Sequence, residues 1–129
     1  MIVTGGYSGL GLEATRAFVE LGAHVIVPAR TRTKAVANLA GLEVELEDLD
    51  LFDPASIDAF AARFLASGRP LHALVNSAGI MAPPLERDAR GYESQFATNH
   101  LGNFQLTARL WPALGAAKGA RVVSVSSRG

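Results

Sequence analysis

The sequence predicts an α/β fold, a doubly wound parallel sheet of about five strands with helices on both faces. Short apolar runs alternate along the chain with segments whose apolar residues recur at helical spacing. A glycine-rich turn, residues 4–11, joins the first apolar run to the first helical segment. Neither a linker nor an internal repeat divides the 129 residues, so we expect one domain with a sizeable core.

Each element is predicted from a local pattern. The apolar runs predict strands at 2–3, 24–27, 42–46, 71–75 and 121–125. Helical spacing predicts helices at 10–21, 31–39, 54–65 and about 91–114, with a loop at 81–84. In the third helix, Asp53 is a capping carboxylate before Pro54, and an apolar stripe runs from Ile57 to Leu65.

The glycines of residues 4–11 have a chemical reason to stand between a strand and a helix. A backbone that approaches a pyrophosphate closely and presents helix N-terminal amides to it leaves no room for side chains. The sequence therefore predicts a phosphate site at the first turn of the first helix. An ordinary glycine-rich turn is the alternative.

Composition excludes several classes of protein. The 12 basic and 12 acidic residues cancel, so no charge footprint for nucleic acid or an anionic membrane is present. The absence of cysteine excludes disulfides and thiolate chemistry. No apolar run is long enough to cross a bilayer. Because only three residues precede the glycine-rich turn, we expect no signal peptide. We expect a cytoplasmic protein with no nucleic-acid, membrane or metal partner.

Four segments at consistent separations, residues 4–11, 76–79, 98–102 and 121–127, resemble the classical short-chain dehydrogenases/reductases. The resemblance is strongest to the branch that includes retinol dehydrogenases and WW-domain oxidoreductases. It implies a Rossmann-type sheet with strand order 3-2-1-4-5. It also implies that residues 1–129 form a dinucleotide-binding domain that is incomplete at the C-terminus, about the first half of a typical member.

The resemblance carries a set of cofactor-binding residues. In this sequence they are Gly5, Tyr7, Ser8, Gly9, Leu10, Gly11, Asp50, Leu51, Asn76, Ala78 and Gly79. Asp50 and Leu51 would flank the adenine, although Asp50 could instead be a second cap for the helix that Asp53 begins. A plain turn is the alternative for residues 76–79.

Arg30 predicts the choice of cofactor. An acidic residue roughly 20 positions after the glycines binds the ribose 2′-hydroxyl in dinucleotide folds, whereas an arginine there suits a 2′-phosphate. Here the second strand ends in Pro28-Ala29-Arg30, without a carboxylate. We therefore expect NADP rather than NAD. The alternative is a solvated arginine that opens an exposed basic stretch with Arg32 and Lys34.

Two residues match the catalytic positions of the family. By resemblance Asn99 holds a water in a proton relay, and Ser127 orients the substrate carbonyl or alcohol. Asn99 could instead be satisfied in the core, and Ser126 and Ser127 could be ordinary turn hydroxyls. His100 has no neighbouring His, Cys or carboxylate cluster, so we interpret it as structural or partly exposed.

The acid/base pair of the family, a tyrosine followed four positions later by a lysine, is absent from these 129 residues. Tyr7 and Tyr92 are followed at that distance by Gly11 and Phe96. The favoured hypothesis is part of an NADP(H)-dependent oxidoreductase acting on a small alcohol or carbonyl compound and homo-oligomeric as a whole protein. The alternative is a non-catalytic dinucleotide-binding module or decayed fragment.

The same incompleteness predicts exposed apolar surface. The last strand would be a sheet edge that carries three valines, Val122, Val123 and Val125. The long helix would lose its cover over Phe104, Leu110 and Trp111.

Overall fold

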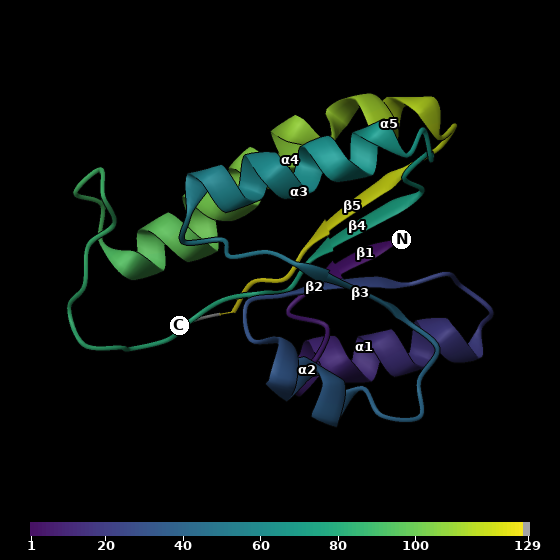
Figure 1. Cartoon of the computed structure of the whole chain (residues 1–129), viewed down its shortest axis with the longest axis horizontal. Helices are drawn as coiled ribbons and strands as arrows, with labels where there is room; N and C mark the ends of the chain where they lie inside the picture. Colours follow the sequence, from purple (N-terminus) through teal and green to yellow (C-terminus); the bar gives the residue numbers. More distant parts are fainter. Residues whose placement is uncertain (128–129) are drawn as a thin grey trace.

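The computed structural model describes residues 1–127 and contains one parallel sheet of five strands in the order β3-β2-β1-β4-β5 (Figure 1). This order confirms the predicted fold. The strands are β1 (Ile2–Thr4), β2 (Ile26–Ala29), β3 (Glu45–Asp48), β4 (Ala73–Asn76) and β5 (Arg121–Ser124). The helices are α1 (Gly9–Glu20), α2 (Arg32–Asn38), α3 (Pro54–Ala66), the π-helix η1 (Phe96–Gly102), α4 (Asn103–Arg109) and α5 (Trp111–Ala116).

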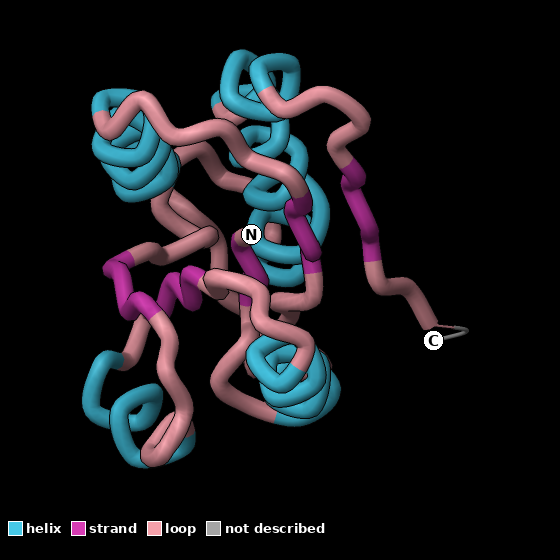
Figure 2. The backbone as a smooth tube through the Cα atoms, turned by 90° about the vertical axis from the view of Figure 1, so that its right-hand side faces the viewer, coloured by secondary structure: helices cyan, strands magenta, loops and turns pink. Residues whose placement is uncertain are grey.

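Helices cover both faces of the sheet. Helices α1 and α2 lie on one face, and α3, α4 and α5 lie on the other (Figures 1 and 2). Because successive side chains of a strand point to opposite faces, β1 divides between the two cores. Ile2 packs with Leu74 and Phe60 on the α3 side, and Val3 packs with Val75 on the α1 side. None of the described helices is long and apolar enough to cross a membrane.

Helix α3 forms as its sequence predicts. The carboxylate of Asp53 accepts a hydrogen bond of 3.0 Å from the Ala55 backbone N–H, and Pro54 occupies the first turn. Ile57 and Phe60 of the predicted stripe are buried. Leu65, at the end of that stripe, is 37% exposed.

Three strands begin later than predicted: β2, β3 and also β4, which starts at Ala73 and not at Leu71. Strand β2 starts at Ile26, and His24 lies exposed before it. Strand β3 runs parallel to β2 with Ile26 opposite Glu45, so its ladder begins at Glu45 and not at Leu42. Leu42 still packs against the core on the α1 side, as its apolar character predicts, but it does so from the loop before β3.

The long helical stretch predicted at 91–114 is divided. An isolated bridge between Arg87 and Glu93 precedes it, and η1, α4 and α5 then follow one another. The division between α4 and α5 falls beside Pro112, which has no backbone N–H for the helical ladder. The predicted loop at 81–84 is confirmed.

The expected apolar exposure is confirmed in most places. Strand β5 is at the edge of the sheet, and its side chains are exposed, as is Val125 just after it. Phe104 and Trp111 are 70% and 64% exposed. Leu110 was wrongly predicted to be uncovered. It is fully buried in the core on the α3 side, one helical turn after the equally buried Leu106.

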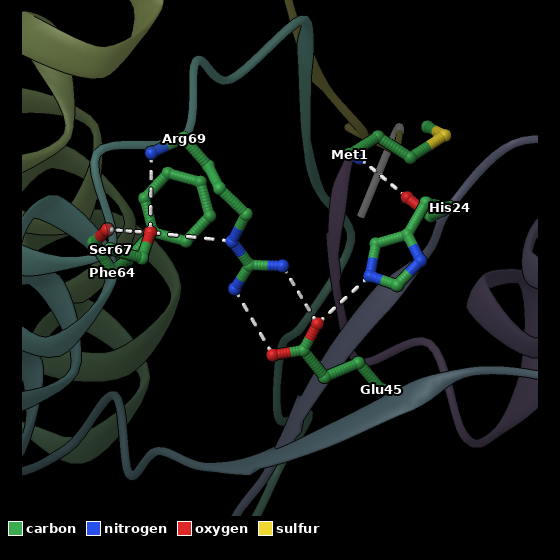
Figure 3. A network of polar contacts seen from close by, with 6 residues as sticks. All are labelled: Met1, His24, Glu45, Phe64, Ser67 and Arg69. Atoms are coloured by element: carbon green, nitrogen blue, oxygen red, sulfur yellow. Dashed lines mark hydrogen bonds and ion pairs between the residues drawn. The ribbon is translucent and has the colours of Figure 1, made fainter.

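A polar network lies at the amino ends of the strands (Figure 3). Glu45, the first residue of β3, accepts two hydrogen bonds from the Arg69 guanidinium, at 2.9 and 3.1 Å, and lies 2.8 Å from His24 Nε2. Arg69 also lies over the ring of Phe64, 5.2 Å from its centroid. Hydrogen bonds from Arg69 and then His24 lower the pKa of Glu45 from its ordinary value of 4.5 to about 2.

Candidate functional site

A cleft of about 420 Å³ opens beyond the carboxyl ends of the strands, where open α/β sheets bind their ligands. It brings together all but one of the predicted cofactor residues. Those that line it are Gly5, Tyr7, Ser8, Gly9, Leu10, Gly11, Arg30, Asp50, Leu51, Ala78 and Gly79. Lining residues that the sequence did not single out for this role include Thr4, Pro28, Lys34, Ser77, Ile80 and Thr98.

The glycines of the turn have separate reasons to lack a side chain. Gly5 has φ +64°, and a Cβ there would lie 2.8 Å from the Ala78 Cα. A Cβ on Gly11 would overlap the Gly5 carbonyl oxygen. Gly9 has φ +52°, and a Cβ there would meet no protein atom within 4 Å. Gly5 and Gly11 thus allow close packing within the protein, whereas Gly9 leaves open space at the cleft.

Thr4 joins the ends of two neighbouring strands. Its buried hydroxyl oxygen accepts hydrogen bonds of 3.1 Å from the backbone N–H groups of Ser77 and Ala78. The same hydroxyl donates to the Val75 carbonyl at 3.4 Å. The turn after β4 is therefore held against β1. Sequence analysis missed this role, although a threonine that ends a buried strand could have signalled it.

Asn76 is the predicted cofactor residue that does not line the cleft. Its buried side chain turns toward α4, where Nδ2 donates to Thr107 Oγ1 at 3.1 Å. Its Oδ1 is buried without a hydrogen-bond partner among the described residues. The side chain thus joins the end of β4 to α4, and a contact with cofactor stays a prediction.

Two cations face the cleft without a counterion among the described residues. Arg30 follows β2, and Lys34 lies on α2; both are exposed, and neither forms an ion pair with any residue in the described part of the chain. Arg32, between them, is committed to Asp48 at 3.0 Å. The three basic residues therefore differ in their contacts: Arg32 is paired with Asp48, whereas Arg30 and Lys34 remain available to an anion. The sequence placed Lys34 only in an exposed basic stretch, and its position at the cleft follows from the packing of α2 beside the glycine turn.

Asp50 organises the loop before α3. Its Oδ1 accepts a hydrogen bond of 3.0 Å from the Phe52 N–H, and its own N–H donates to Ser56 Oγ at 2.8 Å. Asp53 supplies the side-chain cap of α3, so Asp50 closes a turn and does not act as a second cap. The adjacent Leu51 is buried and lines the cleft.

Asn99 lies in η1, exposed and outside the core. Its side-chain amide exchanges two hydrogen bonds of 2.8 Å with the backbone of Ile80, accepting from N–H and donating to C=O. A Cβ on Gly79 would lie 3.2 Å from Asn99 Oδ1, so this glycine gives the amide room. Asn99 thus holds the segment after β4 against η1, at the border of the cleft that Ile80 lines.

Ser127 is exposed beyond the end of β5 and does not line the cleft, although Val125 does. His100 is exposed and stacks on Phe96 at 5.4 Å between ring centroids, in keeping with a structural role. Within residues 1–127, no group of three or more His, Cys, Asp or Glu side chains is placed to hold a metal ion.

Comparison with known proteins identifies the family. The sequence model of the short chain dehydrogenase family matches residues 1–129. Mouse (Mus musculus) retinol dehydrogenase 12 is 39% identical over 98% of this chain and 42% of its own length. A probable oxidoreductase of Streptomyces antibioticus is 46% identical over 98% of this chain and 44% of its own length. The chain belongs to the short-chain dehydrogenase family, a family of oxidoreductases.

Solved structures agree with this assignment. A metagenomic short-chain oxidoreductase in complex with NADP is 33% identical and superimposes with a TM-score of 0.80, covering 98% of this chain and 61% of that protein. The chain spans 42% and 44% of the lengths of the two curated relatives named above.

Proposed function

We propose that this chain is the dinucleotide-binding part of an NADP(H)-dependent oxidoreductase that acts on a small alcohol or carbonyl compound. The observation that carries the proposal is the pair Arg30 and Lys34, two cations that form no ion pair within residues 1–127, at a cleft bordered by a glycine turn. When bound, the nicotinamide would donate or accept the hydride. The residues of this chain would bind and orient it.

The glycine turn fits a pyrophosphate. The first N–H groups of α1 have no partner within the helix and carry the positive end of its dipole. Ser8 precedes the helix, and its side chain makes no capping hydrogen bond. The space beside Gly9 is open. Phosphate oxygens would accept from these N–H groups in that space.

The two cations favour a 2′-phosphate over a 2′-hydroxyl. Arg30 offers a planar set of donors, and Lys34 adds a second charge from the following helix. Asp50 lines the same cleft, but its Oδ1 already accepts from the Phe52 N–H. The complex of a structural neighbour with NADP supports the same choice.

Asn99 and Ser127 are proposed for the catalytic half of the site. Asn99 would hold a water and Ser127 would orient the substrate oxygen, as the family resemblance implies. The proton donor of the family is a tyrosine assisted by a lysine, and these 129 residues contain no such pair.

Titration tests the proposal. We expect the 129-residue chain to bind NADP(H) more tightly than NAD(H). Calorimetry and quenching of the protein's intrinsic fluorescence would measure both affinities. Equal affinities would overturn the NADP assignment, and no binding of either would overturn the dinucleotide site. The chain should show no turnover with alcohols or carbonyls, because general acid/base catalysis is worth about 10²–10⁴-fold. Robust turnover would point to an acid that the sequence does not reveal.

A further inference from the structure

The backbone carbonyls of the glycine turn are held from behind by side chains of two different helices. Thr15 of α1 donates its hydroxyl to the Gly6 carbonyl at 2.9 Å. Asn38, the last residue of α2, donates its Nδ2 to the Tyr7 carbonyl at 2.8 Å and is partly buried. Asn38 reaches this carbonyl across 31 positions of sequence, and no sequence pattern had singled it out.

The bond from Asn38 determines how the next amide points. The peptide bonds are trans, so the Tyr7 C=O and the Ser8 N–H point in opposite directions. With its carbonyl held toward α2, this peptide turns the Ser8 N–H away from that helix. The acceptor that the structure gives this N–H is the Gly5 carbonyl at 3.4 Å, longer than an ordinary N–H···O bond. Ser8 itself lines the cleft.

We propose that Asn38 is a positioning residue for the phosphate-binding turn: it fixes the Tyr7–Ser8 peptide, and with it the course of the backbone beside the space that the pyrophosphate would occupy. The inference rests on the proposed function, since it assumes a dinucleotide in the cleft. It adds a residue that does not line the cleft and acts through a backbone group that does.

The geometry separates this role from that of the cations. Lys34 lies one helical turn before Asn38 on α2 and faces the cleft, whereas Asn38 contacts the back of the turn. Loss of the Asn38 amide therefore changes the pyrophosphate site and leaves the 2′-phosphate site intact. Two ligands distinguish these sites: NADP occupies both, and adenosine 2′-monophosphate has no pyrophosphate to place on the turn.

The test replaces Asn38 by leucine, which has a similar shape and no donor. We expect Asn38→Leu to raise the Kd of the 129-residue chain for NADP about two- to tenfold, the equivalent of one hydrogen bond. Its Kd for adenosine 2′-monophosphate should stay within about twofold. Val36→Ala, a truncation at an exposed position of the same helix, is the control and should change neither constant.

Hydrogen exchange gives a readout that needs no ligand. Without the Asn38 amide, the N–H groups of the turn should exchange faster in Asn38→Leu than in wild type, with α1 unchanged. Unaltered exchange in the turn overturns the positioning role. Equal weakening of both ligands overturns it too, because it would mean that α2 has lost its structure. If wild type binds neither ligand, the proposed function fails, and the exchange measurement alone decides whether Asn38 orders the turn.

Discussion

The backbone carbonyl of Leu51 lies 2.5 Å from the position that a Cβ atom on Gly102 would take. The two residues come from the loop before α3 and from the last position of η1. Their close approach brings η1 against the cleft-lining loop.

This approach predicts the effect of adding one methyl group. Gly102→Ala should lower the free energy of unfolding by about 1–3 kcal/mol, because the backbone of the loop must move. Gly115→Ala is the matched control, an exposed helical position where a Cβ meets nothing within 4 Å. It should be neutral or stabilising by about 0.5–1 kcal/mol. Urea unfolding of both variants measures the difference, and equal effects would contradict the packing argument.

Arg30→Asp should reverse the preference for NADP. The change exchanges an attractive charge for a repulsive one at the proposed 2′-phosphate position. We expect the ratio of the NADP and NAD dissociation constants to shift by about tenfold or more, which titration of both cofactors would measure. Arg32→Ala is the control, because Arg32 pairs with Asp48 and does not line the cleft. An unchanged ratio in Arg30→Asp would exclude Arg30 from cofactor choice.

Thr4→Val should destabilise the turn after β4. Valine keeps the shape of threonine but leaves the N–H groups of Ser77 and Ala78 without the acceptor they now share. We expect a loss of about 1–3 kcal/mol in the free energy of unfolding, measured by thermal or urea denaturation. Thr33→Val, at an exposed position of α2, should change stability by less than about 0.5 kcal/mol. A Thr4→Val variant as stable as wild type would mean that other groups satisfy these amides.

The Glu45 network predicts a loss of stability in acid. The pKa of Glu45 falls from 4.5 to about 2 on folding, so its contribution is fully present above pH 4.5. That contribution disappears as the pH falls from 4.5 to about 2, where the folded protein also takes up the proton. Glu45→Gln should flatten the pH dependence of the unfolding free energy across this window. Glu43→Gln, at an exposed position, should leave the dependence as in wild type, and parallel curves for all three proteins would refute the assignment.

The glycine turn could be predicted from sequence because its chemistry is local. Gly5 and Gly9 take positive φ, and Gly11 packs against the Gly5 carbonyl of the same turn; only the packing of Gly5 against Ala78 is distant in sequence. Asn38 and Lys34 could not be assigned in the same way. Their roles depend on how α2 packs beside the turn, which no pattern within α2 records.

The prediction for Leu110 was wrong because it grouped Leu110 with Phe104 and Trp111 under one lost cover. Leu110 follows Leu106 by one helical turn, and both are buried in the core on the α3 side, whereas Phe104 is 70% exposed. The start of β3 was missed because the pairing with β2, and not its own alternation, sets where the ladder begins.

Strand β1 has three residues, yet each one belongs to a different part of the molecule. Ile2 enters one core, Val3 enters the other, and Thr4 holds the turn after β4 at the mouth of the cleft. Neither layer can therefore unfold independently of the other, because the loss of packing in either one destabilises the strand that both share. Unfolding that begins far from the cleft, in α3 or in α1, would destabilise β1, whose last residue, Thr4, is also the first residue of the glycine turn. We expect the two layers and the ligand site to unfold as one cooperative unit.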